Sequence, residues 1–169
     1  ETTFVAVQDI GLDADGRFVD LQGFVLQAAF KLYPWENMLR EPFAARLARA
    51  ETFWLEPPWK ALLSNKGILP LLWERHEGHP NLLPAFFDDD PKAASLGDSY
   101  VRKPLFSREG ANVEVRSPGL KEPVTDEGYG AEGWIRQAFS PPPQFEGRYP
   151  VVGAWIVGDN PAGVGVRED

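Results

Sequence analysis

Two lysines are the residues best suited to chemistry in this sequence of 169 residues. Lys103 lies in a β-forming segment, directly before Pro104, and a glycine-containing stretch follows at 107–112. Residues 100–115 therefore predict a strand, a tight turn and a second strand. A buried lysine beside such a turn suits a polyphosphate, because the ammonium supplies a charge and the turn supplies backbone N–H donors. An ordinary β-hairpin with a surface lysine is the alternative that this stretch leaves open.

Lys66 stands at the predicted start of an apolar helix over residues 67–77, with Ser64 as its expected cap. A positive charge at this end opposes the helix dipole. The placement is favourable if an anion is held between the ammonium and the free N–H groups of the first turn. An exposed lysine at a junction between loop and helix explains the same residues equally well.

Three other clusters suggest metal ligands, but each favours another interpretation. The Asp-x-Asp-Gly run at 13–16 lacks the 12-residue loop and terminal glutamate of an EF-hand, so we expect a hairpin turn. His76 and His79 lie where Gly78 ends the helix, which favours a polar helix terminus. The three aspartates at 88–90 point in alternate directions on an extended chain, which favours a solvated loop over a magnesium site. The sequence therefore assigns no metal ligand.

Composition narrows the class of protein. A net charge of -8 argues against nucleic acid as a partner, and 43% hydrophobic residues are enough for a packed core. The absence of cysteine excludes disulfides and a cysteine nucleophile and fits a cytoplasmic protein. No apolar run approaches the roughly 18 residues of a membrane span, and no signal peptide is visible. Because the chain opens on Glu1 and stops directly after a strand, we expect a piece of a longer protein.

The remaining pattern predicts short strands and helices that must position the two lysines. Strands are expected at 3–7, 18–21, 25–33, 82–87, 134–139, 149–157 and 162–166. Helical segments are expected at 35–38, from 42 to about 50, and at 59–63. The connection at 117–130 is predicted to be mobile, and the last two strands are predicted to form an antiparallel hairpin buried on both faces. This layout is typical of an α+β domain.

Four blocks, taken in order, resemble a known family. They are Ser64-Asn-Lys66 before the apolar helix, Tyr100-Val-Arg-Lys-Pro104 with Gly110-Ala-Asn-Val113, Trp134-Ile-Arg-Gln-Ala-Phe139, and Gly153-Ala-Trp-Ile-Val-Gly158 continuing through Ala162 to Asp169. Together they are similar to the C-terminal part of the glutathionylspermidine synthase family, whose synthetase domain has an ATP-grasp fold. The resemblance implies that residues 1–169 form a partial ATP-grasp-like α+β domain, with antiparallel strands and a few helices.

The resemblance also implies an activity. Members of this family join a carboxylic acid to an amine with ATP, through an acyl phosphate, and glutathione and spermidine are the family's acid and amine. The implied partners are therefore a small-molecule carboxylate and a small-molecule amine. Two alternatives stay open: a non-catalytic module derived from an ATP-grasp fold that binds a nucleotide or a partner protein, and a purely structural α+β domain.

Individual residues take roles by the same resemblance. Lys66 and Lys103 match the family's two ATP lysines, and Arg167 matches an arginine that could stabilise the transferring phosphoryl group. The loop over the phosphates would be formed by Gly110, Ala111 and Asn112, and the adenine would be read by the backbone of Gln137, Ala138 and Phe139.

The family's Mg²⁺ ligands, an Asp and a Glu-x-Asn pair, have no convincing counterpart before Lys66, so we expect them outside this chain. Without the charge compensation of Mg²⁺, the chain alone is expected to bind nucleotide weakly and not to ligate.

Overall fold

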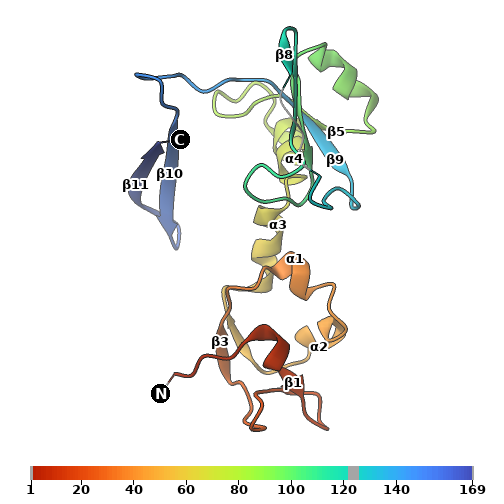
Figure 1. Cartoon of the computed structure of the whole chain (residues 1–169), viewed down its shortest axis with the longest axis vertical. Coiled ribbons are helices and arrows are strands. Elements are labelled where there is room, and N and C mark those ends of the chain that lie inside the picture. The colour runs from red at the N-terminus through yellow and green to blue at the C-terminus, as the bar shows by residue number, and fades with distance from the viewer. Residues whose placement is uncertain (1, 122–125, 169) are drawn as a thin grey trace.

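A computed structural model describes residues 2–121 and 126–168 and shows an elongated molecule built from small parts (Figure 1). An N-terminal unit, a stretch of short helices, a five-stranded sheet and a C-terminal hairpin follow one another along the chain. The chain is thus a mixed α and β structure, with small, mainly antiparallel sheets and a few short helices.

The N-terminal unit is organised around a small aromatic core. Its elements are the 3-10 helix η1 (Val7–Asp9), strands β1 (Gly11–Leu12), β2 (Phe18–Val19), β3 (Ala28–Phe30) and β4 (Phe53–Leu55), and helices α1 (Trp35–Met38) and α2 (Ala44–Leu47). Phe18, Trp35, Met38 and Trp54 are buried together. The Trp54 ring meets Phe18 and Trp35 edge to face, with ring centroids 5.5 and 5.9 Å apart. This core holds α1 in place.

Several predictions for this unit need correction. The strand expected at 3–7 is wrong, since the 3-10 helix η1 begins at Val7 and Phe4 lies exposed, unpaired with any strand of the described residues. The strand expected at 25–33 is reduced to β3, because its partner β4 is only three residues long and pairs with it in parallel, which local sequence did not reveal. The helix expected beyond residue 42 shortens to α2.

The hairpin turn expected at residues 13–16 is confirmed. The carboxylate of Asp13 accepts hydrogen bonds from the backbone N–H groups of Asp15 and Arg17, so the turn closes on itself between β1 and β2.

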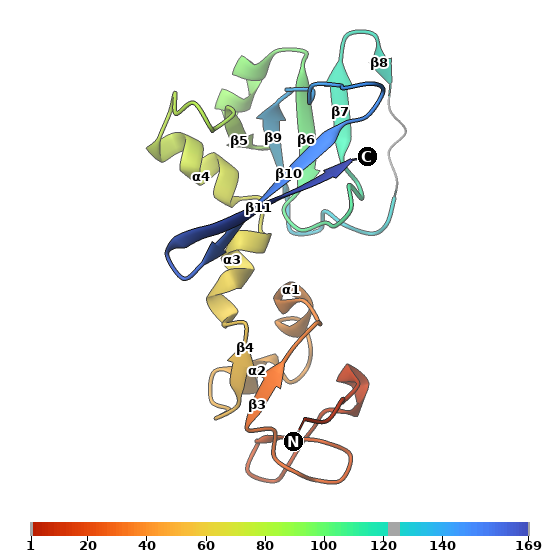
Figure 2. The same ribbon diagram turned by 90° about the vertical axis from the view of Figure 1, so that its left-hand side faces the viewer.

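Short helices connect this unit to the sheet (Figure 2). They are the 3-10 helix η2 (Pro58–Lys60), α3 (Ala61–Ser64) and α4 (Ile68–Arg75). The predicted helix at 67–77 is confirmed over its central part, but its start is stabilised differently: Asn65 Oδ1, rather than Ser64, accepts a hydrogen bond from Gly67 N at 2.8 Å. Among the described residues, no helix has the length and apolar character needed to cross a membrane.

The five-stranded sheet has the order β5-β9-β6-β7-β8 and is antiparallel throughout. Its strands are β5 (Ala85–Phe87), β6 (Tyr100–Pro104), β7 (Glu114–Ser117), β8 (Leu120–Lys121) and β9 (Trp134–Ala138), with the 3-10 helix η3 (Pro91–Leu96) after β5. The predicted hairpin at 100–115 and the predicted strand at 134–139 are confirmed as β6–β7 and β9, and the strand expected at 82–87 shortens to β5.

The connection at 117–130 was expected to be mobile, but its first residues form regular structure, because β8 pairs with β7. The part of that prediction that concerns residues 122–125 lies outside the described residues.

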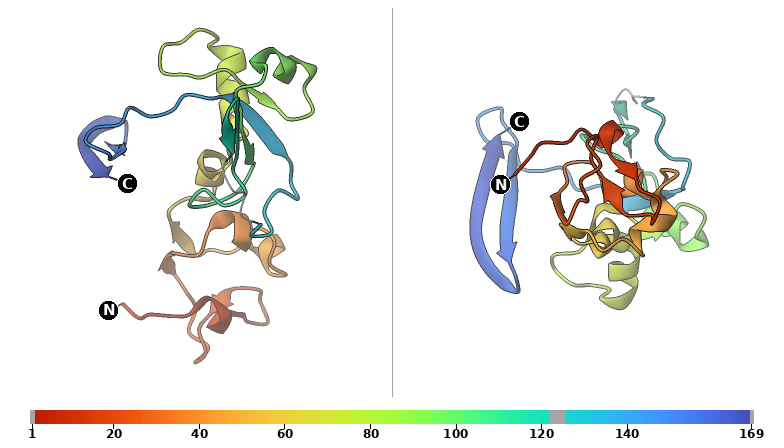
Figure 3. Two further views of the ribbon diagram at one scale, coloured as in Figure 1. Left: turned by 45° about the horizontal axis from the view of Figure 1, so that its top comes forward. Right: turned by 90° about the horizontal axis from the view of Figure 1, so that it is seen from below.

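The C-terminal hairpin consists of β10 (Pro150–Val157) and β11 (Asn160–Glu168). Figures 1 and 3 show it standing apart from the sheet at the end of an extended segment. The hairpin itself was predicted correctly, but its burial on both faces is wrong: Trp155 is 68% exposed and Val164 71% exposed. Apolar side chains on both faces suggested a covered strand pair, yet among residues 2–121 and 126–168 no layer packs on either face.

Candidate functional site

Two successive residues of β6, Arg102 and Lys103, lie on opposite faces of the sheet, because successive side chains of a strand alternate. Arg102 faces Arg136 of β9 across the ladder, while Lys103 lies opposite Ile135. Lys103 is half-buried, and its Nζ donates a hydrogen bond to Gln137 Oε1 at 2.8 Å. Gln137 is itself buried on the same face of β9. This contact fixes the ammonium of Lys103 over the centre of the sheet.

Lys66 reaches the same region from the start of α4. Its backbone N–H donates to Leu105 O at 2.8 Å, immediately after β6 ends. Its Nζ donates to Ser107 O and to Ser107 Oγ, at 3.0 and 2.9 Å. The close approach depends on Gly67, where a Cβ atom would lie 3.3 Å from the side chains of Leu105 and Phe87. Lys66 is thus attached at both its backbone and its ammonium to the segment that follows Lys103.

The structure brings the two lysines together and adds a third cation, Arg108. Burial lowers the pKa of Lys66, and the nearby charges of Lys103 and Arg108 lower it further, against the opposing effect of Glu36. Burial alone lowers the pKa of Lys103. Within the described parts of the chain, neither lysine has a carboxylate at ion-pair distance. Half-buried positive charges without an ion-pair partner are costly, and a bound anion would relieve that cost.

The loop between β6 and β7 adjoins the cation cluster, which we define as Lys66, Lys103 and Arg108. The loop supplies Arg108, and its Ser107 accepts the hydrogen bonds from Lys66. Three of its residues have positive φ angles: Glu109 at 52°, Gly110 at 78° and Asn112 at 54°. Asn112 is buried and anchors the loop, since its Oδ1 accepts from Glu127 N at 2.8 Å and its Nδ2 donates to Tyr129 O at 3.3 Å. Ala111 is buried next to it. Gly110 remains open, since no atom of the described residues outside its own neighbours lies within 4 Å of the position of a Cβ atom.

The residues predicted to read adenine lie at the end of β9 and just beyond it. The backbone N–H groups of Ala138 and Phe139 donate to Pro84 O at 2.8 Å and Ser99 O at 3.4 Å. A ligand that used these two donors would have to replace those bonds. The side chain of Gln137 is committed to Lys103. The predicted role of these three residues in binding adenine therefore stays a prediction.

Arg167 does not join the cation cluster in this structure. It lies on β11, opposite Val151 of β10, in the hairpin that stands apart from the sheet (Figure 1). Its predicted role at the transferring phosphoryl group stays a prediction, and Asp169 of the same block lies outside the described residues.

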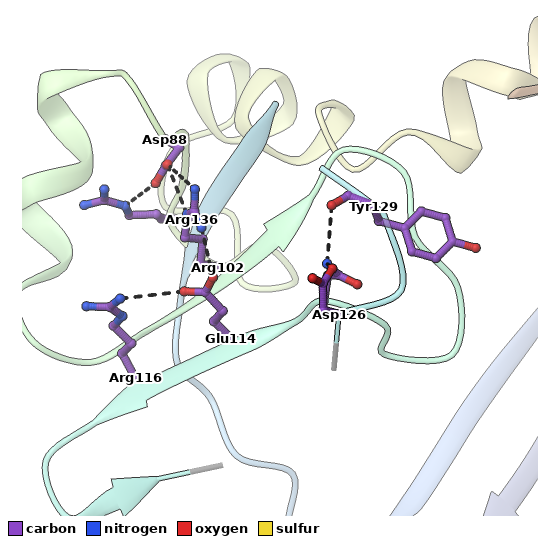
Figure 4. Close-up of polar contacts among 8 residues, drawn as sticks. Asp88, Arg102, Glu114, Arg116, Asp126, Tyr129 and Arg136 are labelled. Carbon is purple, nitrogen blue, oxygen red and sulfur yellow. Dashed lines mark hydrogen bonds and ion pairs between the residues drawn. The ribbon is translucent and has the colours of Figure 1, made fainter. Parts of the chain in front are cut away.

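The opposite face of the sheet carries an ion network that sequence reasoning missed (Figure 4). The carboxylate of Asp88 accepts from the Nε and Nη2 atoms of Arg102, at 3.1 and 3.0 Å, and from Arg136. Arg102 also donates to Glu114 and stacks on the Trp134 ring, 4.0 Å from its centroid. The prediction of a solvated loop is therefore wrong for Asp88, because its side chain points toward β6 and β9 and binds Arg102 and Arg136 there.

A cavity of about 590 Å³ lies between the N-terminal unit and the loop after β6. Its lining residues are Phe30, Lys31, Leu32, Pro34, Leu55, Glu56, Pro57, Lys60 and Arg108. The Lys31 side chain is only 6% exposed, 3.5 Å from a carboxylate oxygen of Glu56 and 4.5 Å from the centroid of the Trp35 ring. Arg108 belongs to both this cavity and the cation cluster, so the two sites adjoin.

Sequence reasoning treated Arg108 and Ser107 as turn residues and Lys31 as the end of a strand. The one signal available for Arg108 was a charged residue inside a glycine-containing turn directly after Lys103. Across residues 2–121 and 126–168, no group of three or more His, Cys, Asp or Glu side chains is placed to hold a metal ion.

The sequence matches the family described as "Glutathionylspermidine synthase preATP-grasp" over residues 1–169. A Haemophilus influenzae protein with the provisional name of acid–amine ligase is 42% identical over 177 residues, an alignment that covers 98% of this chain and 44% of that protein. Trypanothione synthetase of Crithidia fasciculata is 28% identical, over 98% of this chain and 28% of its own length.

The bifunctional glutathionylspermidine synthetase/amidase of Escherichia coli K12 is 29% identical, over 96% of this chain and 30% of the longer protein. The chain thus spans less than half of the length of each of these curated relatives.

Proposed function

This chain belongs to the glutathionylspermidine synthase family, and on that premise we propose that it is the nucleotide-binding part of an ATP-dependent carboxylate–amine ligase. Its relatives are named as acid–amine ligases and synthetases, which supports a reaction that joins an acid to an amine. We further propose that residues 1–169 are part of one ATP-grasp-like synthetase domain. The five-stranded sheet and the loop after β6, to which Lys66 is bonded, support this assignment.

The convergence of Lys66 and Lys103, with Lys66 bonded to Ser107 of the loop after β6, is the observation that carries the proposal. The two ammonium groups would neutralise oxygens of the β- and γ-phosphates, and open backbone at Gly110 would allow the loop to approach them closely. Arg108, which belongs both to the cluster and to the lining of the adjoining cavity, would attract the phosphates and the carboxylate of the acid substrate.

The proposed chemistry has two steps. A carboxylate oxygen of the acid attacks the γ-phosphorus of ATP, the bond from that phosphorus to the β–γ bridging oxygen breaks, and ADP leaves. The nitrogen of the neutral amine then attacks the acyl carbon of the resulting acyl phosphate. Phosphate leaves with the former carboxylate oxygen and takes up the proton that the nitrogen loses, and the amide remains. The cations of this chain would act on charge and position rather than on bonding, as in other phosphoryl transfers.

The cavity beside Arg108 is the proposed location of the acid. The three cations of its lining, Lys31, Lys60 and Arg108, outnumber its one acid, Glu56, which pairs with both lysines. Phe30, Leu32 and Leu55 add an apolar wall, and the combination fits a small carboxylate with an uncharged body. The described residues do not offer a set of ligands for Mg²⁺, so we derive no step from the metal and expect its ligands elsewhere in the longer protein.

A thermal-shift titration with ATP tests nucleotide binding. ATP should raise the unfolding temperature of this chain, and Lys66→Ala and Lys103→Ala should abolish the shift, whereas Lys92→Ala, an exposed lysine outside the cluster, should retain it. A shift that survives in both cluster variants would contradict the site.

Ligase chemistry is tested separately on the longer parent protein. Release of ADP and phosphate should require a carboxylate and a polyamine together. ATP binding without ADP release for any pair of acid and amine would favour the alternative function, a non-catalytic nucleotide-binding module.

A further inference from the structure

Glu36 is a buried acid placed among cations. It lies in the first turn of α1, its side chain is 10% exposed, and its Oε1 accepts a hydrogen bond from Arg108 Nη2 at 2.6 Å. Its second oxygen, Oε2, is buried and has no hydrogen-bond partner among the described residues. A buried carboxylate oxygen without a partner is costly, so the arrangement calls for an explanation beyond folding.

Among the described residues, Glu36 is the one ion-pair partner of Arg108. Its side chain is 56% exposed, whereas Glu36 is buried, so the acid provides the fixed end of the pair. The loop around Arg108 is joined to the rest of the site through the bonds of Lys66 to Ser107 and through Asn112. Without Glu36 the guanidinium would be free to sample many rotamers at the mouth of the cavity.

A second ion pair joins the N-terminal unit to the residues around the sheet, and here the N-terminal unit supplies the base instead of the acid. Arg40 lies just after α1, four positions beyond Glu36, and pairs with Glu132 just before β9. Arg40 also lies over the Phe106 ring, 6.0 Å from its centroid. Glu36 in the first turn of α1 and Arg40 just after the helix therefore each pair with an opposite charge near the sheet. Together with the Arg40–Phe106 contact, these pairs define the position of the 106–108 segment against the N-terminal unit.

We propose that Glu36 is a positioning residue that holds the Arg108 guanidinium at the junction between the cation cluster and the acid cavity. The inference rests on the proposed function, because it deepens the account of the same site. Glu36 acts on the ligand only through Arg108: it selects one arginine rotamer, so that the third positive charge is in place before an anion arrives.

The proposal predicts that Glu36→Gln changes the affinity for an anion in the direction opposite to that expected from charge alone. If Glu36 were only a nearby negative charge, Glu36→Gln would strengthen the binding of an anion, since it removes a repulsion. If Glu36 positions Arg108, the same substitution removes the charge-assisted hydrogen bond between the two side chains, and Arg108 is no longer held in place to meet an anion. Binding of inorganic triphosphate should then weaken about tenfold. Calorimetric titration with triphosphate measures the difference, and Glu51→Gln, an exposed acid of the same N-terminal unit, is the control for net charge.

A double-mutant cycle separates the two effects. Arg108→Met should weaken triphosphate binding about as much as Glu36→Gln does, and adding Glu36→Gln to Arg108→Met should cause no further loss. Additive losses would show that Glu36 acts independently of Arg108 and would overturn the proposal. Binding by Glu36→Gln as tight as wild type or tighter would also overturn it.

Hydrogen exchange of the ligand-free protein decides the point even if triphosphate does not bind. The amides of Ala111 and Val113 donate to Arg108 O and Gly110 O, so they report on the loop. Glu36→Gln should accelerate their exchange about tenfold, and Glu51→Gln should not. Unchanged exchange rejects the positioning role, whereas failure of the wild type to bind triphosphate rejects the proposed function alone.

Glu36→Asp provides a second test in case Glu36→Gln does not fold. It retains the charge with a shorter side chain, so it should give an intermediate acceleration of exchange at Ala111 and Val113. Exchange at the wild-type rate in this variant, with Glu36→Gln unfolded, would count against the proposal.

Discussion

Lys103 and Gln137 are joined across the centre of the sheet, with Nζ of the lysine 2.8 Å from Oε1 of the glutamine. The contact crosses from β6 to β9 on the face toward which Lys66 also reaches. A neutral amide fixes the position of the ammonium without neutralising it. The full charge of Lys103 is therefore retained for an anion, which an acidic partner at the same place would prevent.

Replacing that amide by a carboxylate should disable the site with little change of shape. Gln137→Glu would give Lys103 an ion-pair partner, and we expect the affinity for ATP to fall at least about tenfold, because the new negative charge repels phosphate. Gln144→Glu makes the same change of charge at an exposed position and is the control. Equal ATP affinities for Gln137→Glu and Gln144→Glu, measured by calorimetry, would contradict the placement of the phosphates beside Lys103.

Local pattern, together with the resemblance to a known family, was enough to predict the strands and the turn that carry this part of the candidate site. β-Branched and aromatic residues marked β6 and β9, a glycine marked the turn, and the order of the blocks singled out both lysines. What local pattern could not supply was pairing over distance. The Arg108–Glu36 contact joins positions 72 apart, and the parallel pair β3–β4 encloses two helices, so neither is encoded in any short window.

Burial was the other quantity that pattern could not fix. Apolar residues on both faces of β10–β11 read as a covered hairpin, but burial depends on which other segments lie against a strand and not on its own composition. The three aspartates at 88–90 show the reverse case. Alternation along the chain correctly separated their directions, yet only the fold shows that Asp88 turns toward two arginines.

The lysines of the cluster should make anion binding sensitive to alkaline pH. The pKa values of Lys66 and Lys103 are both lowered from the ordinary 10.5, so the lysines lose their protons before exposed lysines do. The affinity for triphosphate should therefore decline as the pH rises toward 10.5, and binding there should take up protons. Calorimetry in two buffers of different ionisation enthalpy, at several pH values, measures both effects; affinity that is constant up to pH 10.5 would contradict a lysine site.

The same shifts have a consequence for stability. A lysine with a lowered pKa binds fewer protons in the folded state than in the unfolded state, so its contribution to the free energy of unfolding rises with pH between its folded and unfolded pKa values. Lys103→Met should therefore raise the free energy of unfolding at neutral pH and flatten this rise, while Lys92→Met should change neither. Urea unfolding at pH 7 and pH 10 provides the comparison.

Asp88 should be a major source of stability in the sheet. Burial would raise the pKa of Asp88, but hydrogen bonds and charges from Arg102 and Arg136 outweigh it and lower that pKa. Asp88→Asn would leave two half-buried arginines without their shared carboxylate, at a cost of about 2 kcal/mol. Because the folded pKa is depressed, the stabilisation is present above pH 4 and is lost as the pH falls through the folded pKa.

Asp89→Asn is the matched control for Asp88→Asn, since Asp89 is adjacent and exposed. Urea unfolding should show the loss only for Asp88→Asn, and the two variants should converge in stability at acidic pH. Equal stabilities at pH 7 would show that the ion network in Figure 4 does not stabilise the sheet.

Two tryptophans provide a test of the burial that the fold assigns. Trp54 is 8% exposed and packs edge to face on two rings, whereas Trp155 of β10 is 68% exposed. Trp54→Ala should lower the free energy of unfolding by about 3–5 kcal/mol, and Trp155→Ala by no more than about 0.5 kcal/mol. Quenching of the tryptophan fluorescence by iodide should fall in Trp155→Ala and not in Trp54→Ala. A large loss of stability in Trp155→Ala would mean that another layer covers the hairpin.

Arg167 should separate binding from turnover. In this structure it lies on the detached hairpin, away from the cation cluster, so Arg167→Ala should leave the ATP affinity of the 169-residue chain unchanged. In the longer parent protein, a role at the transferring phosphoryl group predicts that ADP release falls by a factor of about 10² to 10³ with little change in the KM for ATP. Arg148→Ala, an exposed arginine just before β10, is the control in both assays. Unchanged turnover would remove Arg167 from the mechanism, and a loss of ATP affinity in the isolated chain would show that the hairpin reaches the lysines in solution.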